Sequence, residues 1–399
     1  MTLPAAPAYD GAHLRHVLTS AAAALGIDGF SNQLNFPESS ITVVILSDGL
    51  GEANLAAHTG HARFLARAWR SPQQARTLDT AAATTTASSL TSLGTGLTPG
   101  EHGMVSYDVF APHLGRVVNM LGGWDPDVDP TSWQPHPTVL TAAEAAGADV
   151  LTVSRPQFRD SALTQAALRG GQFAGSSTIA GRFGLAADWI AQHRPRSATM
   201  RQGPVPRLLV YLYVDELDKT GHSLGAGSAK WLTMLENLDA AAAQFSRQLK
   251  ERYGGQASVL LTADHGMVNV AEHNRLDISA REDLLSRVRH TGGEPRMLHL
   301  YTEEGAAEQV RDVWQQAFGD LVWAVTAEEA IAAGWFGPVQ TSVRPRIGDV
   351  LIAARQDTAI FHTARTGTQP LSMIGQHGSL TEAERRVPLL ELSGRGFDD

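Results

Sequence analysis

The chain has 399 residues, of which 43% are hydrophobic and 18% are charged, with 38 glycines and 19 prolines. This composition is typical of a globular protein of enzyme size, and it excludes disorder, collagen and coiled coil as descriptions of the whole chain. The formal net charge of −9 argues against a stable complex with nucleic acid. The absence of cysteine excludes disulfides, thiolate metal ligands and a cysteine nucleophile.

The first 26 residues lack a basic start followed by an apolar run, which is the pattern of a secretory signal peptide. Asp10, His13 and Arg15 interrupt the apolar residues there. No stretch of about 18 apolar residues occurs elsewhere, so we expect no membrane-spanning helix. The sequence therefore predicts a soluble cytoplasmic protein without a membrane partner.

Short apolar runs alternate with helical patterns along the chain. Between the third and the fourth run, apolar residues recur at helical spacing from Trp231 to Leu249, as expected of a crossover helix. This alternation predicts an α/β fold with a mostly parallel central sheet and helices on both faces. The runs expected to form buried strands of this sheet are 41–46, 150–153, 208–214, 258–262 and 349–354.

The stretch 274–344 differs from the rest, because it combines a strand-like run with helical patterns and separates two expected strands of the sheet. We interpret it as a smaller inserted subdomain. Residues 38–273 and 345–399 would then form the core, and residues 1–37 an N-terminal extension.

Residues that can bind metal follow several of the expected strands, at the sheet edge where open α/β sheets bind ligands. Taken singly, an aspartate after a strand is usually part of a turn, and a histidine is usually structural. Asp218 and His222 lie four residues apart in a stretch containing glycine, which we interpret as a turn. Together, three aspartates and three histidines could hold two divalent cations, zinc or manganese. They are Asp48, Asp218, His222, Asp264, His265 and His377.

A segment rich in hydroxyl residues, 84–103, lies between the first two expected strands. Leu90, Leu93 and Leu97 predict a short helix that begins near Ala87. The threonines before it have two interpretations. They could cap the helix. Alternatively, one of them could attack phosphorus beside metal ions, with the helix N-terminus attracting the anion.

The order Asp-Gly, Thr, His-Gly, Asp-x-x-x-His, Asp-His-Gly and His-Gly resembles the alkaline phosphatase superfamily. It is most similar to the nucleotide pyrophosphatase/phosphodiesterase branch, which includes the type I phosphodiesterases. The resemblance extends over roughly 42–388, and the stretch 274–344 resembles the family least. It implies an alkaline phosphatase-like fold and a two-metal phosphoester hydrolase that acts through a phospho-threonine intermediate.

The resemblance also implies the roles of individual residues. In the family, the nucleophilic threonine lies nine residues before the threonine that corresponds to Thr95, which gives Thr86; Thr85 is the alternative if the alignment slips by one. One zinc ion would be held by Asp218, His222 and His377. The other would be held by Asp48, Thr86, Asp264 and His265.

The chain departs from the family pattern where a phosphate-binding asparagine is expected, since Tyr107 occupies that position. Its hydroxyl could donate to a phosphoryl oxygen. Lys219 either faces the phosphate or is a surface lysine.

The expected substrate is a small phosphoester, with a nucleotide as one candidate. We expect a phosphodiesterase or nucleotide pyrophosphatase. The alternatives are a phosphomonoesterase or a phosphonate hydrolase with the same metal site, and the weakest is a metal-binding protein without turnover.

Overall fold

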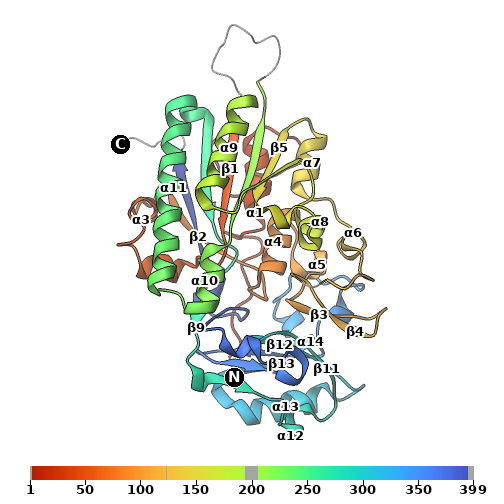
Figure 1. Cartoon of the computed structure of the whole chain (residues 1–399). Coiled ribbons are helices and arrows are strands. Elements are labelled where there is room, and N and C mark those ends of the chain that lie inside the picture. The colour runs from red at the N-terminus through yellow and green to blue at the C-terminus, as the bar shows by residue number, and fades with distance from the viewer. Residues whose placement is uncertain (1, 123, 194–204, 394–399) are drawn as a thin grey trace.

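Seven strands form the central sheet of the computed structural model (Figure 1), which describes residues 2–122, 124–193 and 205–393. Residues 394–399 of the expected core lie outside this description. The strand order is β2-β17-β8-β1-β7-β5-β6. The strands are β1 (Ile41–Ser47), β2 (Ala75–Asp79), β5 (Asp149–Ser154), β6 (Gln172–Gly175), β7 (Leu208–Val214), β8 (Ala257–Thr262) and β17 (Arg386–Ser393).

The pairing of these strands confirms the predicted fold class. β1 pairs in parallel with β7 and β8, and β5 pairs in parallel with β6 and β7. Only β17 is paired antiparallel, with β2 on one side and β8 on the other. Every residue of β1, β7 and β8 is buried, which is why their sequences are nearly continuous apolar runs.

Helices cover both faces of the sheet (Figure 1). The long helix α11 (Ala229–Tyr253) is the expected crossover between β7 and β8, and it packs beside α9 (Ile179–His193). On the other face lie α1 (His16–Ala24) and α7 (Val139–Ala145). Leu14, Val17 and Leu18 join the main hydrophobic core, so the N-terminal residues pack directly onto the sheet.

A second sheet lies beside one end of the central sheet (Figure 1). Its antiparallel strands run in the order β11 (Val288–Glu294), β12 (Met297–Thr302), β14 (Val350–Ala354) and β13 (Val322–Thr326), and α13 (Ala307–Phe318) packs against it around a separate apolar cluster. The run at 349–354 was expected in the central sheet, and this expectation is wrong. An apolar run predicts a strand but not its partner, and β14 pairs with β12 and β13.

Shorter elements connect these layers. They are α2 (Glu52–Ala57), α3 (Arg63–Trp69), α4 (Thr86–Thr95), α5 (Pro99–His102), β3 (Asp108–Ala111), β4 (Arg116–Asn119), α6 (Pro130–Trp133), η1 (Pro156–Phe158), α8 (Ala162–Ala167), α10 (Glu216–Leu224), β9 (Val268–Asn269), β10 (Arg275–Asp277), α12 (Glu282–Leu285), α14 (Ala327–Ala332), β15 (Ala359–Phe361), α15 (Thr363–Thr366), β16 (Gly375–Gln376) and α16 (Glu382–Arg385).

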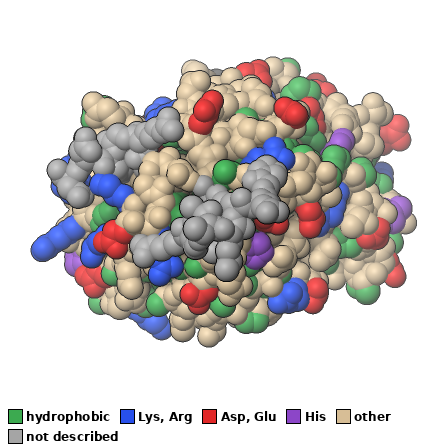
Figure 2. Space-filling model, turned by 90° about the horizontal axis from the view of Figure 1, so that it is seen from above, with side chains coloured by type: hydrophobic (Ala, Val, Ile, Leu, Met, Phe, Trp, Pro, Cys, Tyr) green, Lys and Arg blue, Asp and Glu red, His purple; other side chains and the backbone are tan. Residues whose placement is uncertain are grey.

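The face seen in Figure 2 carries Lys and Arg side chains interspersed with Asp and Glu, without a broad basic area among the atoms that the view describes. Mixed charge of this kind offers no continuous track for a phosphate backbone.

Candidate active site

Three neighbouring strands bring the predicted aspartates together. β8, β1 and β7 are adjacent and parallel, so their carboxyl ends lie side by side. Asp48 directly follows β1, and Asp264 lies two residues beyond the end of β8. Asp218 lies in α10, which follows β7.

Asp218 and His222 lie on a helix, not in the turn that the glycine suggested. Their four-residue spacing places both side chains on one face of α10, where His222 Nε2 lies 3.3 Å from Asp218 Oδ1. The glycine instead fits a close contact. A Cβ atom at Gly221 would lie 2.2 Å from Met267 Sδ.

His377 reaches the site because β16 pairs with β9, which follows His265 closely in the chain. Its Nδ1 atom donates to the carbonyl oxygen of Thr84 at 2.8 Å, and His222 Nδ1 donates to the carbonyl oxygen of Gly375 at the same distance. Because a carbonyl oxygen only accepts, each Nδ1 atom carries the proton and each Nε2 atom keeps a free lone pair. The two Nε2 atoms lie 3.3 Å apart, as needed for two ligands of one ion.

Asp48, Asp264 and His265 form a second, deeper set. His265 Nε2 lies 3.2 Å from Asp48 Oδ1 and 3.6 Å from Asp264 Oδ2. The hydroxyl of Tyr213 donates to Asp48 Oδ2, which leaves Oδ1 directed at the other members. We call Asp48, Asp264 and His265 the strand-end group, and Asp218, His222 and His377 the α10 group. The ligand atoms of Asp218, His265 and His377 also lie within 4.8 Å of one another, so the two groups are contiguous.

The electrostatics of these residues fit divalent cations. Burial, followed by the charge of Asp48, raises the pKa of Asp264 well above its usual range. Burial also raises the pKa of Asp218 to about 6. Burial alone would lower the pKa of His265, but the charges of Asp264 and Asp48 outweigh it and raise the value to about 10. These shifts are what crowded, buried carboxylates produce without a cation between them.

Three carboxylate oxygens in the two groups have no well-aligned hydrogen-bond donor among the described residues: Asp48 Oδ1, Asp218 Oδ1 and Asp264 Oδ2. Buried charges without donors are costly unless they face an opposite charge. Oxygen and imidazole nitrogen donors are the ligand set of zinc. The residues present therefore fit the metal ions that the sequence predicts.

Thr86 begins α4 at the edge of the strand-end group, and its Oγ1 atom lies 3.3 Å from His265 Nε2. Thr85 precedes it at the N-cap position, but its side chain makes no capping hydrogen bond. The capping interpretation of Thr85 is therefore wrong. Because Thr86 is the first residue of α4, it lies at a helix N-terminus, where amide N–H groups without helical partners favour an anion.

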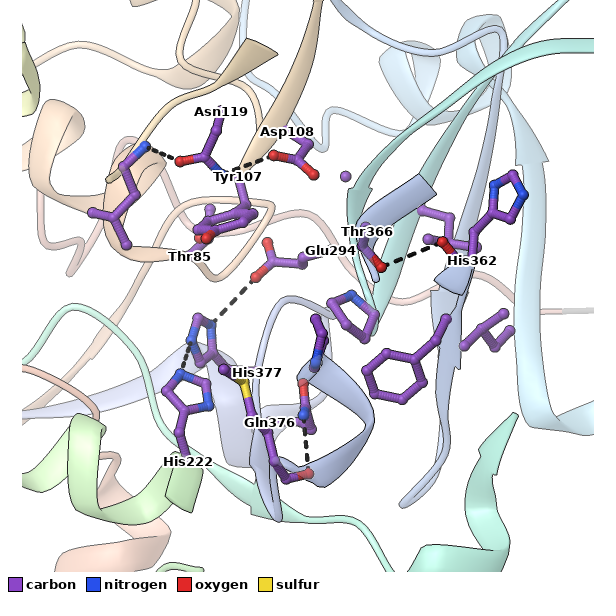
Figure 3. A pocket seen from close by; sticks show the side chains of 18 of the residues that line it. Thr85, Tyr107, Asp108, Asn119, His222, Glu294, His362, Thr366, Gln376 and His377 are labelled. Carbon is purple, nitrogen blue, oxygen red and sulfur yellow. Dashed lines mark hydrogen bonds and ion pairs between the residues drawn. The ribbon is translucent and has the colours of Figure 1, made fainter. Parts of the chain in front are cut away.

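Two cavities meet beside these residues, and Thr86, Leu121 and Asp218 line both of them. The first, of about 470 Å³, extends toward the small sheet, and Figure 3 shows Tyr107, Glu294 and His377 around it. The second, of about 560 Å³, extends along the central sheet.

The structure places Tyr107 and Lys219 in different cavities. Tyr107 lies just before β3 and lines the first cavity, where burial raises the pKa of its hydroxyl. Lys219 lines the second cavity with its side chain 52% exposed, and its Nζ atom lies 2.5 Å from Asp215 Oδ2. The lysine charge is thus already paired.

Sequence reasoning missed Tyr213, Glu294 and Asn119. Tyr213 is the penultimate residue of β7, and its position near the carboxyl edge of the sheet was the available signal. Glu294 Oε2 lies 3.5 Å from His377 Nδ1, but the residue comes from β11 of the small sheet, where no motif marked it. Asn119 ends β4 and donates to Asp108 beside Tyr107. Its place depends on the β3–β4 pairing.

The model of the family "type I phosphodiesterase / nucleotide pyrophosphatase" matches residues 42–380. The chain belongs to this family. It is therefore a hydrolase of the phosphodiesterase/nucleotide pyrophosphatase type, and the resemblance drawn from the motifs is confirmed. A search of curated proteins found no match.

Solved structures of the same fold agree with the family. Murine ectonucleotide pyrophosphatase/phosphodiesterase 5 is 17% identical with a TM-score of 0.67, over 90% of this chain and 89% of that one. Phosphonoacetate hydrolase from Sinorhizobium meliloti, in complex with phosphonoacetate, is 16% identical with a TM-score of 0.65, over 91% and 92% of the two chains. These likenesses confirm the expected alkaline phosphatase-like fold. Within the described part of the chain, every helix is too short or too polar to cross a bilayer.

Proposed function

We propose that this hydrolase cleaves phosphodiesters through a phospho-threonine intermediate on Thr86, with two zinc ions held by the strand-end group and the α10 group. One observation carries the proposal. The two cavities of about 470 and 560 Å³ meet at Thr86 and Asp218. A diester has a substituent on each side of phosphorus, whereas a monoester has one and would leave a cavity without an occupant.

The chemistry follows from the positions of the chain's own groups. Bound zinc ions would lower the pKa of the Thr86 hydroxyl and neutralise charge on the phosphoryl oxygens. Thr86 Oγ1 forms a bond to phosphorus, the bond to one substituent breaks, and that substituent leaves as an alcohol after gaining a proton. Water then attacks phosphorus and releases the phosphomonoester and free Thr86. The N-terminus of α4 stabilises the developing negative charge throughout.

The second cavity favours a nucleotide as one part of the substrate. The Phe158 ring stands on its wall, 6.0 Å from the Tyr213 ring and 5.3 Å from Lys219 Nζ. The Phe158 ring is partly buried, and an aromatic surface on a cavity wall suits stacking by a nucleobase. An inactive variant of the murine phosphodiesterase 5 was solved in complex with AMP, which agrees with such a substrate.

The test is hydrolysis by zinc-loaded protein of bis-p-nitrophenyl phosphate, p-nitrophenyl phosphate and phosphonoacetate in parallel. We expect the diester to be cleaved at least about tenfold faster, in kcat/KM, than either other substrate, since one lost substituent is worth a kilocalorie or more. Acid quenching during turnover of the diester, followed by mass spectrometry, should find the p-nitrophenyl phosphoryl group, which keeps the second substituent, on the peptide that contains Thr86. Faster cleavage of the monoester or of phosphonoacetate would replace this proposal with the corresponding alternative.

A further inference from the structure

Around the start of α10 lies a cluster of charged residues that the proposed chemistry does not use, and two of its members, Asp215 and Lys219, line the second cavity beside Asp218. Asp215 and Glu216 stand at the start of the helix, three and two residues before Asp218. Three cations from three different segments surround them. They are Arg155 after β5, Arg182 in α9 and Lys219 in α10.

Arg182 is the most buried member of the cluster. Its side chain is fully inaccessible, and its Nη2 atom lies 2.5 Å from both carboxylate oxygens of Glu216. Its Nη1 atom lies 3.6 Å from Asp215 Oδ1. Since water does not reach this guanidinium, Glu216 and Asp215 are the charges that compensate it, and α9 and α10 are bound together at this point.

The other two cations are less buried, since the side chain of Arg155 is 20% exposed and that of Lys219 is 52% exposed. Arg155 Nε lies 2.5 Å from Asp215 Oδ1, and Arg155 Nη2 lies 3.1 Å from Glu216 Oε1. Lys219 contacts Asp215 from within the same helix, so this pair does not join α10 to another element. Arg182 is thus the inner anchor of the helix start.

α10 supplies Asp218 and His222, whereas the strand-end group follows β1 and β8 directly. A shift of about 1 Å in a ligand-bearing element is enough to spoil a metal site. We propose that Arg182 is a positioning residue, which sets the position of α10 through Glu216 and thereby the geometry of the α10 group. The inference rests on the proposed metal function. It assigns a task to a residue that touches neither metal ligand nor substrate.

The experiment is calorimetric titration of the metal-free full-length protein with Zn²⁺, supported by metal analysis after dialysis. The wild-type chain should bind two ions. Arg182→Met should bind one ion tightly, with the second weakened at least about tenfold, the range seen when supporting residues of metal sites are lost. Arg182→Lys should lie between the two, because an ammonium cannot bridge both carboxylate oxygens in the same plane.

Two further variants separate positioning from simple loss of stability. Arg182→Met combined with Glu216→Leu removes both buried charges, so it should fold, which circular dichroism verifies, yet still bind the second ion weakly. Arg385→Met is the matched control, because Arg385 is also a buried arginine in an ion pair, with Asp79, but lies in α16. It should keep two ions.

Two tight ions in every folded Arg182 variant, or recovery of the second ion in the double variant, would overturn the positioning role. Absence of tight zinc from the wild-type protein would be a different failure. It would overturn the proposed function, and with it any site for Arg182 to position.

Discussion

The strand-end group and the α10 group are held in different ways. Asp264 and His265 are completely buried and follow a central strand of the sheet. In the α10 group, the His222 side chain is 23% exposed and His377 follows the two-stranded pairing of β16 with β9. One group is thus fixed by the core, and the other by a helix and a short ribbon that face the cavity.

This difference indicates that the two groups have different mobility. Ligands on strands surrounded by the core keep their geometry because any movement would disturb dense packing. Ligands on a short helix and a two-stranded ribbon can adjust while a substrate enters and a product leaves. We therefore expect the strand-end group to bind its ion more tightly than the α10 group binds its own. Thr86 adjoins the strand-end group, so its reactivity should depend on the ion bound there. The predictions below test this comparison, beginning with the largest expected effect.

Thr86→Ala should lower kcat for the diester by at least about a thousandfold, because it removes the attacking oxygen while leaving both ligand groups in place. Zinc binding should be nearly unchanged, since six other ligands remain. Thr86→Ser should retain part of the activity. Thr85→Ala is the control, and its effect should be mild. The reverse result would place the nucleophile at Thr85, and full activity in both variants would exclude a covalent threonine intermediate.

Substitution of one ligand in each group compares them directly. Asp218→Ala or His377→Ala should abolish turnover, yet metal analysis should still find about one ion per chain in the strand-end group. Asp264→Asn should lose turnover and should lose more of the bound metal than Asp218→Ala or His377→Ala. Asp264 shares its ion with His265, and the ligand atom of His265 also lies within 4.8 Å of those of Asp218 and His377. Dialysis against a weak chelator should likewise remove the ion of the α10 group first from the wild-type protein. Equal loss of both ions would contradict the comparison.

The strand-end group shows how far sequence alone could lead. Asp48, Asp264 and His265 follow apolar runs whose strand character is unambiguous, so their meeting at one sheet edge was predictable. The sequence predicts a turn around Asp218 where the structure has a helix, because Gly221 reflects a contact with Met267, and a contact between distant segments leaves no local pattern.

The same limit applies to the remaining parts of the site. Glu294 reaches His377 only because the small sheet lies against the core, and β14 joins that sheet through partners that its own residues do not reveal. The two cavities are likewise products of tertiary packing. Motif order identified the family and predicted candidate ligands, whereas the shape around them required the structure.

The metal-free protein should respond to pH in a characteristic direction. The pKa of Asp218 is raised to about 6 and that of His265 to about 10, so the folded state binds these protons more tightly than the unfolded state. The stability they contribute is present below the unfolded-state values, about 4 for Asp and 6.5 for His. It is lost as the pH rises toward the two folded values.

Zinc binding must displace the same protons and therefore becomes more favourable as the pH rises. The increase in Tm caused by zinc should accordingly be larger at about pH 8 than at about pH 5. Thermal unfolding of chelator-treated and zinc-loaded protein at both pH values measures this increase in Tm. The Asp218→Ala variant should show a smaller pH dependence, and an equal zinc effect at both pH values in the wild-type protein would contradict the prediction.

The smallest effect is expected from Lys219→Ala. Its ammonium is half exposed and paired with Asp215, which Arg155 also contacts, so its loss should change the free energy of unfolding by about 0.5 kcal/mol or less. If the lysine held the transferred phosphoryl group, removing it would instead cost about a hundredfold in kcat, as for other charge-stabilising donors. Lys219→Met separates the contributions further, because it keeps an apolar chain near the Phe158 ring without the charge. A threefold change in kcat corresponds to less than one kilocalorie of transition-state energy. A kcat within about threefold of wild type in both variants would therefore assign the lysine to the rim of the second cavity. A large loss of kcat in both variants would indicate that the lysine contacts the transferred phosphoryl group.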